Sequence, residues 1–169
     1  MSHEATAKTH QKNTNTWTRR LTFMTDRKRG FEFLEHTADA YIAAYGEDLA
    51  EAFENAALAL FETMTDTESV KPANERTITA KGEDKQALLY NWLERLLVLF
   101  EVERMLFSKF RVSKIQKNEE GFRFEAKAYG EPYDPQRHRQ KVGVKAVTYH
   151  RMEVNEALSG VVLRFILDI

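Results

Sequence analysis

The sequence contains no cysteine and no long apolar run, and each absence excludes a class of protein. Without cysteine the chain has no disulfides, no thiolate metal sites and no cysteine nucleophile, so any metal must be bound by oxygen or imidazole. Since no stretch of about 18 or more residues is apolar, the sequence predicts no membrane span. The N-terminus lacks the apolar core of a secretory signal, which favours a cytoplasmic protein without a membrane partner.

The sequence motifs of common catalytic sites are missing as well. No Walker loop, GxSxG elbow, HExxH helix or Gly-rich dinucleotide turn occurs in the chain. We therefore expect that the protein is not an enzyme in its own right.

Positive charge is scarce in most of the chain and concentrated at its N-terminal end. The net charge is −1, yet residues 1–30 hold seven Lys or Arg against two acids, which leaves 18 against 24 for the rest. The bulk charge of that remainder does not favour a broad nucleic-acid-binding surface. If RNA is involved, we expect the contact to be local or to belong to a partner.

Length and composition favour one globular domain behind a polar extension. With 43% hydrophobic and 30% charged residues, a chain of 169 residues suits one domain, or one domain that carries an inserted module. Residues 1–29 are polar, Thr-rich and basic without periodicity, which is typical of disorder. We expect a disordered basic extension at 1–29, with Met24 as a candidate start, and a single domain at 30–169. The oligomeric state does not follow from the sequence.

The pattern of residues 31–64 predicts a hairpin followed by a helix. Residues 31–34 and 41–45 are rich in aromatic and β-branched residues, which favours two strands around a turn at 36–39. After Gly46, apolar residues recur every three or four positions, which predicts one apolar stripe on a helix. Asp48 is the expected N-cap, with Glu51 completing a capping box.

A second helix is predicted after Asp84. Its apolar residues repeat at helical spacing as far as Phe100 and form a wide face. A wide apolar face can be buried centrally or can bind another protein, and we favour packing in the core.

Short strands account for most of the remaining chain. Strand patterns occur at 76–80, 107–115, 122–129, 141–149 and 161–169, with a loop at 130–139. The pairing of 107–115 with 122–129 around a polar turn predicts an antiparallel hairpin. Two helices, seven or eight strands and no strict βα alternation predict an α+β fold, in which two amphipathic helices pack on one face of a mainly antiparallel sheet.

The last strand carries the strongest indication of a metal site. Its alternation of buried and exposed positions continues to the end of the sequence, so Asp168 and the carboxyl group of Ile169 are expected to be held in the sheet. Two fixed carboxylates that lie this close need a cation between them. Asp39 could supply a third carboxylate if its strand pairs with the last strand in register, although a lone Asp in a turn commonly binds only nearby backbone.

Oxygen ligands decide which metal such a site prefers. Carboxylates favour calcium, magnesium or manganese over zinc or copper, and we expect a divalent cation, with calcium favoured and manganese or magnesium as alternatives.

Three further residues are candidates for a supporting role. His36 could be a ligand, could orient Asp39 from outside the metal site, or could only form a local hydrogen bond. Lys145 could neutralise a carboxylate or a partner's phosphate. His138 lies near Glu131, Asp134 and His150, which together could form a second His and carboxylate site, but we favour a packing or partner-contact role for it.

Several motifs resemble one family. EHTADAYIAAYG followed by DLAEAFENAALALF is similar to the opening signature of the archeases, and EPYDPQRH, VKAVTYH and the terminal LDI resemble later landmarks of that family in the same order. The resemblance covers about Met24 to Ile169. It implies an archease-like fold and an accessory protein of the RtcB-type RNA ligase, which joins RNA ends in tRNA splicing and RNA repair. It also implies that Asp39, Asp168 and Ile169 are metal-binding positions.

The resemblance further implies a function through the ligase. Archeases promote guanylylation of the ligase and its repeated turnover, so we expect RNA to be met only indirectly, through that partner. Two alternatives remain open on the residues alone. One is a metal-dependent phosphoesterase or nuclease, because metals activate water, and the other is a chaperone-like or RNA-binding interaction module.

Overall fold

Two hairpins from opposite ends of the sequence form one antiparallel sheet in the computed structural model, which describes Lys28 and residues 30–169. The first hairpin is β1 (Gly30–Leu34) and β2 (Ala40–Gly46), and the second is β7 (Ala146–Ala157) and β8 (Gly160–Asp168). The strand order is β1-β2-β8-β7, so β8 lies between β2 and β7. Apart from Lys28, the extension predicted at 1–29 lies outside the described residues.

Helix α2 (Leu49–Met64) covers this sheet and begins as the sequence predicts. The Asp48 carboxylate accepts a hydrogen bond from the backbone N–H of Glu51 at 2.9 Å, which confirms the N-cap. The Glu51 carboxylate accepts from Glu47, one residue before the cap, so the reciprocal bond of the predicted capping box is displaced by one position. The apolar stripe is buried as predicted; it includes Ala52, Phe53, Ala56, Leu60, Phe61 and Met64.

The middle of the chain forms a second antiparallel sheet and the second long helix. Its elements are β3 (Asn74–Gly82), α3 (Lys85–Glu103), β4 (Met105–Val112), β5 (Gln116–Asn118) and β6 (Gly121–Pro132). The strand order is β3-β6-β4, and β5 pairs with β6. A short 3-10 helix, η1 (Thr67–Ser69), connects α2 to this part. This part is inserted in sequence between α2 and β7, as the prediction of an inserted module requires.

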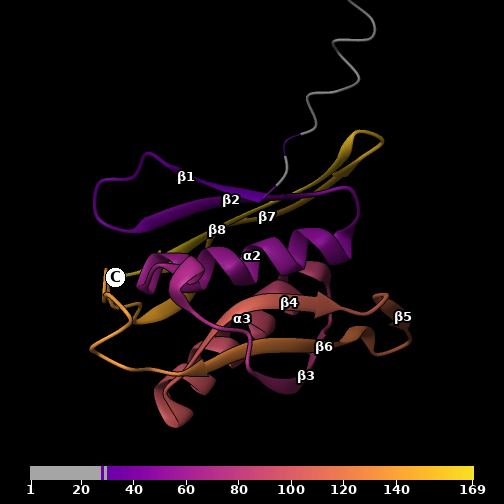
Figure 1. Cartoon of the computed structure of the whole chain (residues 1–169). Coiled ribbons are helices and arrows are strands. Elements are labelled where there is room, and N and C mark those ends of the chain that lie inside the picture. The colour runs from indigo at the N-terminus through magenta and orange to yellow at the C-terminus, as the bar shows by residue number, and fades with distance from the viewer. Residues whose placement is uncertain (1–27, 29) are drawn as a thin grey trace, which may run out of the picture.

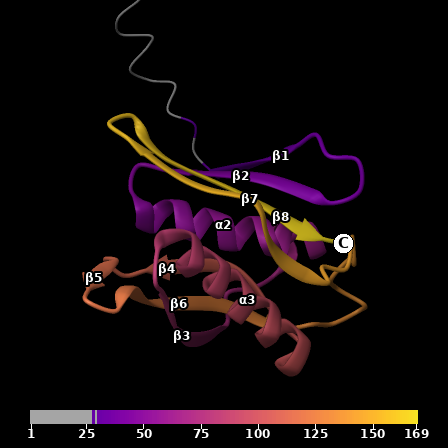
Figure 2. The same cartoon turned by 180° about the vertical axis from the view of Figure 1, so that it is seen from behind.

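Both long helices lie between the two sheets. Helix α2 contacts β2 on one side and β4 on the other, and α3 contacts β7 and β3 (Figures 1 and 2). The predicted α+β class, with two helices packed on antiparallel sheet, is confirmed. The strands form two sheets, and each sheet packs one face on the helix layer.

One apolar core fills the space between the layers. Trp92 of α3 is fully buried, and its Nε1 donates a hydrogen bond to the Phe53 carbonyl of α2 at 3.0 Å. Its ring meets Phe124 of β6 edge to face, with the centroids 5.2 Å apart. The wide apolar face of α3 is therefore core, as predicted; its buried residues are Leu88, Leu89, Trp92, Leu93, Leu96 and Leu97. Neither long helix among the described residues has the length and apolar character of a membrane span.

Several strand boundaries differ from the predicted ones. The strand predicted at 141–149 begins only at Ala146, because the preceding stretch binds the end of α2: Lys141 N–H donates to the Met64 carbonyl at 2.9 Å. Strand β6 continues through Gly130 to Pro132, into the predicted loop, and β4 ends at Val112 rather than at 115.

Gly130 permits the close approach of β4 and β6. A Cβ atom at this position would lie 1.8 Å from the carbonyl oxygen of Leu106, whereas one at Gly143 would meet nothing within 4 Å. We expect Gly130→Ala to lower the free energy of unfolding by about 1–3 kcal/mol, because the backbone of β4 at Leu106 must move away from the added Cβ atom. Gly143→Ala, the matched control, should stay within about 0.5 kcal/mol. Urea unfolding of both variants measures this, and equal midpoints would contradict the expectation.

Candidate functional site

Asp39 and Asp168 directly follow the last paired residues of β2 and β8, at one end of the first sheet. Strands β2 and β8 pair antiparallel with Ala40 opposite Leu167, and the next positions outward are Asp39 and Asp168. Residues directly opposite each other in such a ladder project to the same face, with Cβ atoms about 4.5–5.5 Å apart. The ladder ends at Ala40 and Leu167, and its register, continued by one position, sets Asp39 opposite Asp168.

The end of β8 is fixed from its other side by Lys145. The backbone N–H of Lys145 donates to the Asp168 carbonyl at 2.8 Å, and its Nζ donates to the main-chain oxygen of Ile169 at 2.9 Å. Lys145 directly precedes β7, although the strand predicted at 141–149 would have included it. Its ammonium group nevertheless binds the main-chain oxygen of Ile169.

His36 stabilises the turn that carries Asp39. Its Nδ1 accepts a hydrogen bond from the backbone N–H of Asp39 at 3.2 Å and lies 3.6 Å from the Asp39 carboxylate. Because Nδ1 is an acceptor here, the proton of the neutral ring is on Nε2. The ring also packs edge to face on Tyr41, with the centroids 6.2 Å apart.

These groups fit a hard divalent cation. Two carboxylates and the main-chain carboxyl group of Ile169 are the type of ligand that calcium, magnesium and manganese prefer. Within the described part of the chain, no three His, Cys, Asp or Glu side chains gather to hold a metal. The third ligand of this set is a main-chain group, and calcium takes six to eight oxygens, so water or a partner would supply the others.

A second polar cluster surrounds Glu131 at the end of β6. Both carboxylate oxygens of Glu131 accept from the Arg137 guanidinium, at 2.7 and 3.0 Å, and one also accepts from the Lys71 backbone N–H at 2.8 Å. The Arg137 guanidinium lowers the pKa of the Glu131 carboxyl to about 2. Glu131 is only 7% exposed, so its charge is satisfied inside the protein.

His138 belongs to this cluster. It is 1% exposed, its Nε2 lies 3.0 Å from the Glu131 carboxylate, and its Nδ1 accepts from the Asp134 backbone N–H at 2.9 Å. Both ring nitrogens are thus engaged within the chain, while His150 lies exposed on β7. The alternative of a second His and carboxylate metal site is not supported.

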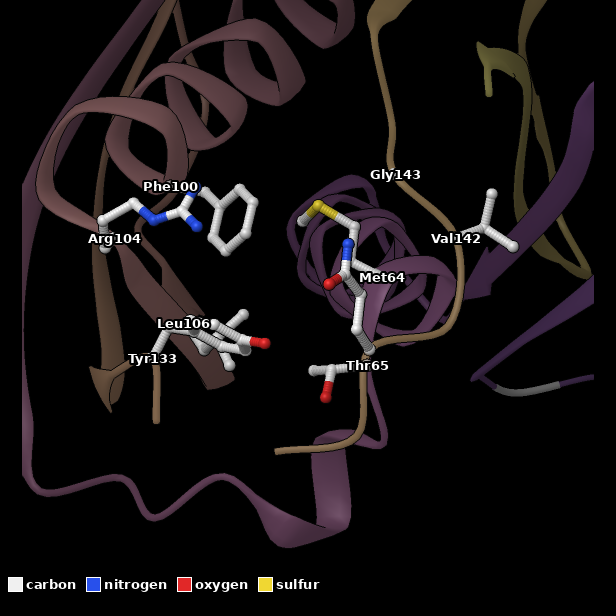
Figure 3. Close-up of a pocket in the computed structure, with 9 residues that line it drawn as sticks. Met64, Thr65, Phe100, Arg104, Leu106, Tyr133, Val142 and Gly143 are labelled. Atoms are coloured by element: carbon white, nitrogen blue, oxygen red, sulfur yellow. The ribbon is translucent and has the colours of Figure 1, made fainter. Parts of the chain in front are cut away.

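A small cavity of about 70 Å³ opens between the ends of the two long helices. In Figure 3, Arg104 and Phe100 of α3 face Met64 of α2 across the cavity, with Tyr133 and Leu106 on a third side. The guanidinium carbon of Arg104 lies 5.2 Å from the Phe100 ring centroid and 5.6 Å from that of Tyr133. The remaining lining residues are Thr65, Gln140, Val142 and Gly143.

Sequence reasoning did not single out this cavity. Its residues come from α2, α3, β4 and the loop after β6, and they share no spacing that the sequence would show. One unusual feature at the cavity is local. Helices commonly end at a glycine in the left-handed conformation, but no glycine follows α3, and Arg104 takes this conformation instead, with φ at 54°.

Comparison with known proteins gives matches over the whole described domain. The archease protein family matches residues 31–169. Protein archease of Sulfurisphaera tokodaii is 50% identical over 139 residues, covering 82% of this chain and 98% of the relative. Protein archease of Methanothermobacter thermautotrophicus is 47% identical over 141 residues, covering 83% and 99%.

A solved structure agrees with these matches. The solution structure of Methanobacterium thermoautotrophicum protein 1598 has a TM-score of 0.73 and 47% identity to this chain, covering 83% of it and 99% of that protein. The similarity therefore includes both sequence and fold.

The Glu131 cluster predicts a specific loss of stability in acid. The Glu131 carboxyl has a pKa of about 2 in the fold against 4.5 ordinarily, a difference that corresponds to about 3 kcal/mol. Because the pKa is lowered, this stabilisation is complete above pH 4.5 and disappears as the pH falls toward 2. Glu131→Gln should therefore lower the free energy of unfolding by about 3 kcal/mol at pH 7. It should also make that free energy less dependent on pH between pH 2 and pH 4.5. The exposed Glu120→Gln is the control, and equal curves for the two variants would refute the assignment.

Proposed function

Because the chain belongs to the archease protein family, we propose that it acts in the cytoplasm as an accessory factor of an RtcB-type RNA ligase. In this proposal it promotes guanylylation of the ligase and its repeated turnover in tRNA splicing and RNA repair. Family membership confirms the resemblance, and the activity that the resemblance implies is the part proposed here.

One observation carries the link from family to mechanism. Strands β2 and β8 pair as far as Ala40 and Leu167, so Asp39 and Asp168 directly follow the last pair, and Lys145 binds the adjacent Ile169. Acidic oxygens assembled by strand pairing need no rearrangement before they bind a cation. This supports a preformed carboxylate site as the working part of the protein.

Each residue has a distinct role in the proposed site. Asp39 and Asp168 would hold the cation from neighbouring strands, together with the main-chain carboxyl group of Ile169. Lys145 holds Ile169 in place, and His36 fixes the turn that presents Asp39. Calcium is the favoured metal, with manganese and magnesium as alternatives.

The proposed action concerns the phosphate groups of the ligase's nucleotide. A divalent cation, when bound, would supply positive charge to phosphate oxygens. The carboxylates of this chain would help to position that charge against the ligase or to exchange it. The Lys145 ammonium group uses one N–H on Ile169, and its other N–H groups could contact a phosphate.

Asp39→Asn and Asp168→Asn test the site directly. Each change keeps the shape of the side chain but removes one negative oxygen ligand, so we expect at least about ten-fold less stimulation of ligase guanylylation. Glu119→Gln, an exposed change in the turn between β5 and β6, should stimulate fully. Calorimetric titration with calcium and with manganese should show weaker binding for the two Asp variants only, and thermal unfolding should show intact folds.

The position of the last main-chain carboxyl group has its own test. One glycine added after Ile169 should abolish stimulation because the carboxylate moves away from Asp168, whereas Ile169→Val keeps it in place and should remain active. Full stimulation by the extended variant would refute the role of Ile169. Turnover of a generic phosphodiester by the protein with manganese, without any ligase, would instead support a phosphoesterase.

A further inference from the structure

The outer face of the second sheet is basic, although the domain as a whole is acidic. Residues 31–169 hold 18 Lys or Arg against 24 Asp or Glu. The side chains of β3, β4 and β6 that point away from the helix layer include five bases and two acids: Lys81, Lys109, Arg111, Arg123, Lys127, Glu75 and Glu125. Positive charge is therefore concentrated on this basic face, whereas the rest of the domain is acidic.

The basic face is open to solvent. On β6 the buried Phe124, Ala126 and Ala128 point to the helix layer, so the exposed residues between them point the other way. Helices α2 and α3 contact the sheet from its buried side, and neither lies on its outer face (Figures 1 and 2). An extended ligand can therefore lie across all three strands.

Like charges lie directly opposite each other in two rows of the basic face. Lys81 of β3 pairs with Arg123 of β6, and Lys127 of β6 pairs with Arg111 of β4. Cross-strand pairs of like charge lower the stability of a sheet. The side chains of Lys81 and Arg123 form no hydrogen bond or ion pair with any described residue. This row is therefore a basic pair that a bound anion would stabilise.

The second row is only partly neutralised. Lys127 Nζ lies 2.9 Å from the Glu75 carboxylate, and the Arg111 guanidinium lies 3.4 Å from the Glu54 carboxylate. The Lys127 and Arg111 side chains are 49% and 62% exposed, so water and salt screen both pairs. Both cations can therefore turn toward an anionic ligand at little cost.

One aromatic ring lies among these charges. Tyr129 of β6 is opposite Lys109 of β4, whose ammonium group lies 5.7 Å from the ring centroid. Proteins that bind single-stranded nucleic acids combine cations that bind phosphates with aromatic rings on which bases stack, and some present these rings on an open sheet. The ring therefore favours a nucleic acid over an acidic protein segment as the ligand.

We propose that the basic face of the β3-β6-β4 sheet binds single-stranded RNA without sequence specificity. The basic side chains contact phosphates, which carry no sequence information, and Tyr129 stacks on one unpaired base. The choice of RNA over DNA rests on the proposed function, in which the ligase joins RNA ends. The inference adds direct contact with RNA to that function, and it involves no residue of the carboxylate site.

Fluorescence anisotropy of the full chain, without ligase, tests the proposal. The probe is a labelled single-stranded RNA of mixed sequence and about 15 nucleotides, the length that one small domain covers. If all five bases contact phosphates, the logarithm of the affinity should fall with the logarithm of the salt concentration with a slope of about −3.5.

The charge contribution is tested with a double variant. Lys81→Gln with Arg123→Gln should weaken binding at least about ten-fold and make the salt slope shallower by about 1.4, because two phosphate contacts are lost. Since the change also removes a like-charge pair, the unfolding temperature should not fall. Arg139→Gln with Arg164→Gln changes the net charge equally outside the basic face and should bind normally.

The stacking contribution has a different signature. Tyr129→Leu should weaken binding at least about five-fold without changing the salt slope, because stacking releases no counterions. Tyr129→Phe keeps the ring and should bind like the unchanged chain.

The basic residues before the domain need a separate control. Arg19→Gln with Arg20→Gln should leave at least half of the affinity, and complete loss of binding in this variant alone would assign the RNA contact to residues 1–29 and overturn the proposal. Unchanged RNA binding by Lys81→Gln with Arg123→Gln would also overturn it. If that variant bound RNA normally but no longer bound the ligase, the basic face would instead belong to an acidic protein surface.

Failure of this inference can be distinguished from failure of the proposed function. Guanylylation of the ligase is measured without RNA, so Lys81→Gln with Arg123→Gln should stimulate it fully. Loss of RNA binding in this variant together with full stimulation is the expected result.

Discussion

The pairing of β2 with β8 is the constraint on which the rest of the structure depends. It joins two hairpins from opposite ends of the described chain into one sheet, with Gly46 opposite Val161 and Ala40 opposite Leu167. The inner face of that sheet packs on α2, and the inserted module packs on the other side of the helix layer (Figure 1). Asp39 and Asp168 directly follow the last pair of this ladder. One ladder of backbone hydrogen bonds thus fixes both the core and the acidic end of the sheet.

Local patterns were enough to predict most elements but not their arrangement. The N-caps at Asp48 and Asp84 and the apolar stripes of both helices follow from spacing alone, because a helix repeats every 3.6 residues. Periodicity cannot show how many sheets a set of strands forms, so the second sheet was missed. The start of β7 was placed too early because residues 141–145 have strand composition but bind α2, a tertiary contact that overrides local preference.

The candidate sites also differ in how much of each could be predicted from the sequence. Alternation in the last strand led to Asp168 and Ile169, and the pairing with Asp39 was stated as a condition that only coordinates could test. The hydrogen bond from Lys145 to Ile169 and the cluster around Glu131 depend on side-chain directions, which spacing does not encode. The Arg104 cavity could not be found from the sequence, because four separate segments contribute its walls. The residues of one strand can be identified from the sequence, whereas contacts between separate elements require the structure.

The central position of β8 has a kinetic consequence. Strands β3 to β6 and α3 are close in sequence and can form by local loop closure, but β2 must wait for a partner that lies more than a hundred residues later along the chain. Such non-local pairing is slow relative to local structure. During refolding, the edge of β2 that pairs with β8 therefore stays unpaired until the two hairpins meet, and this interval is when the chain is most exposed to aggregation.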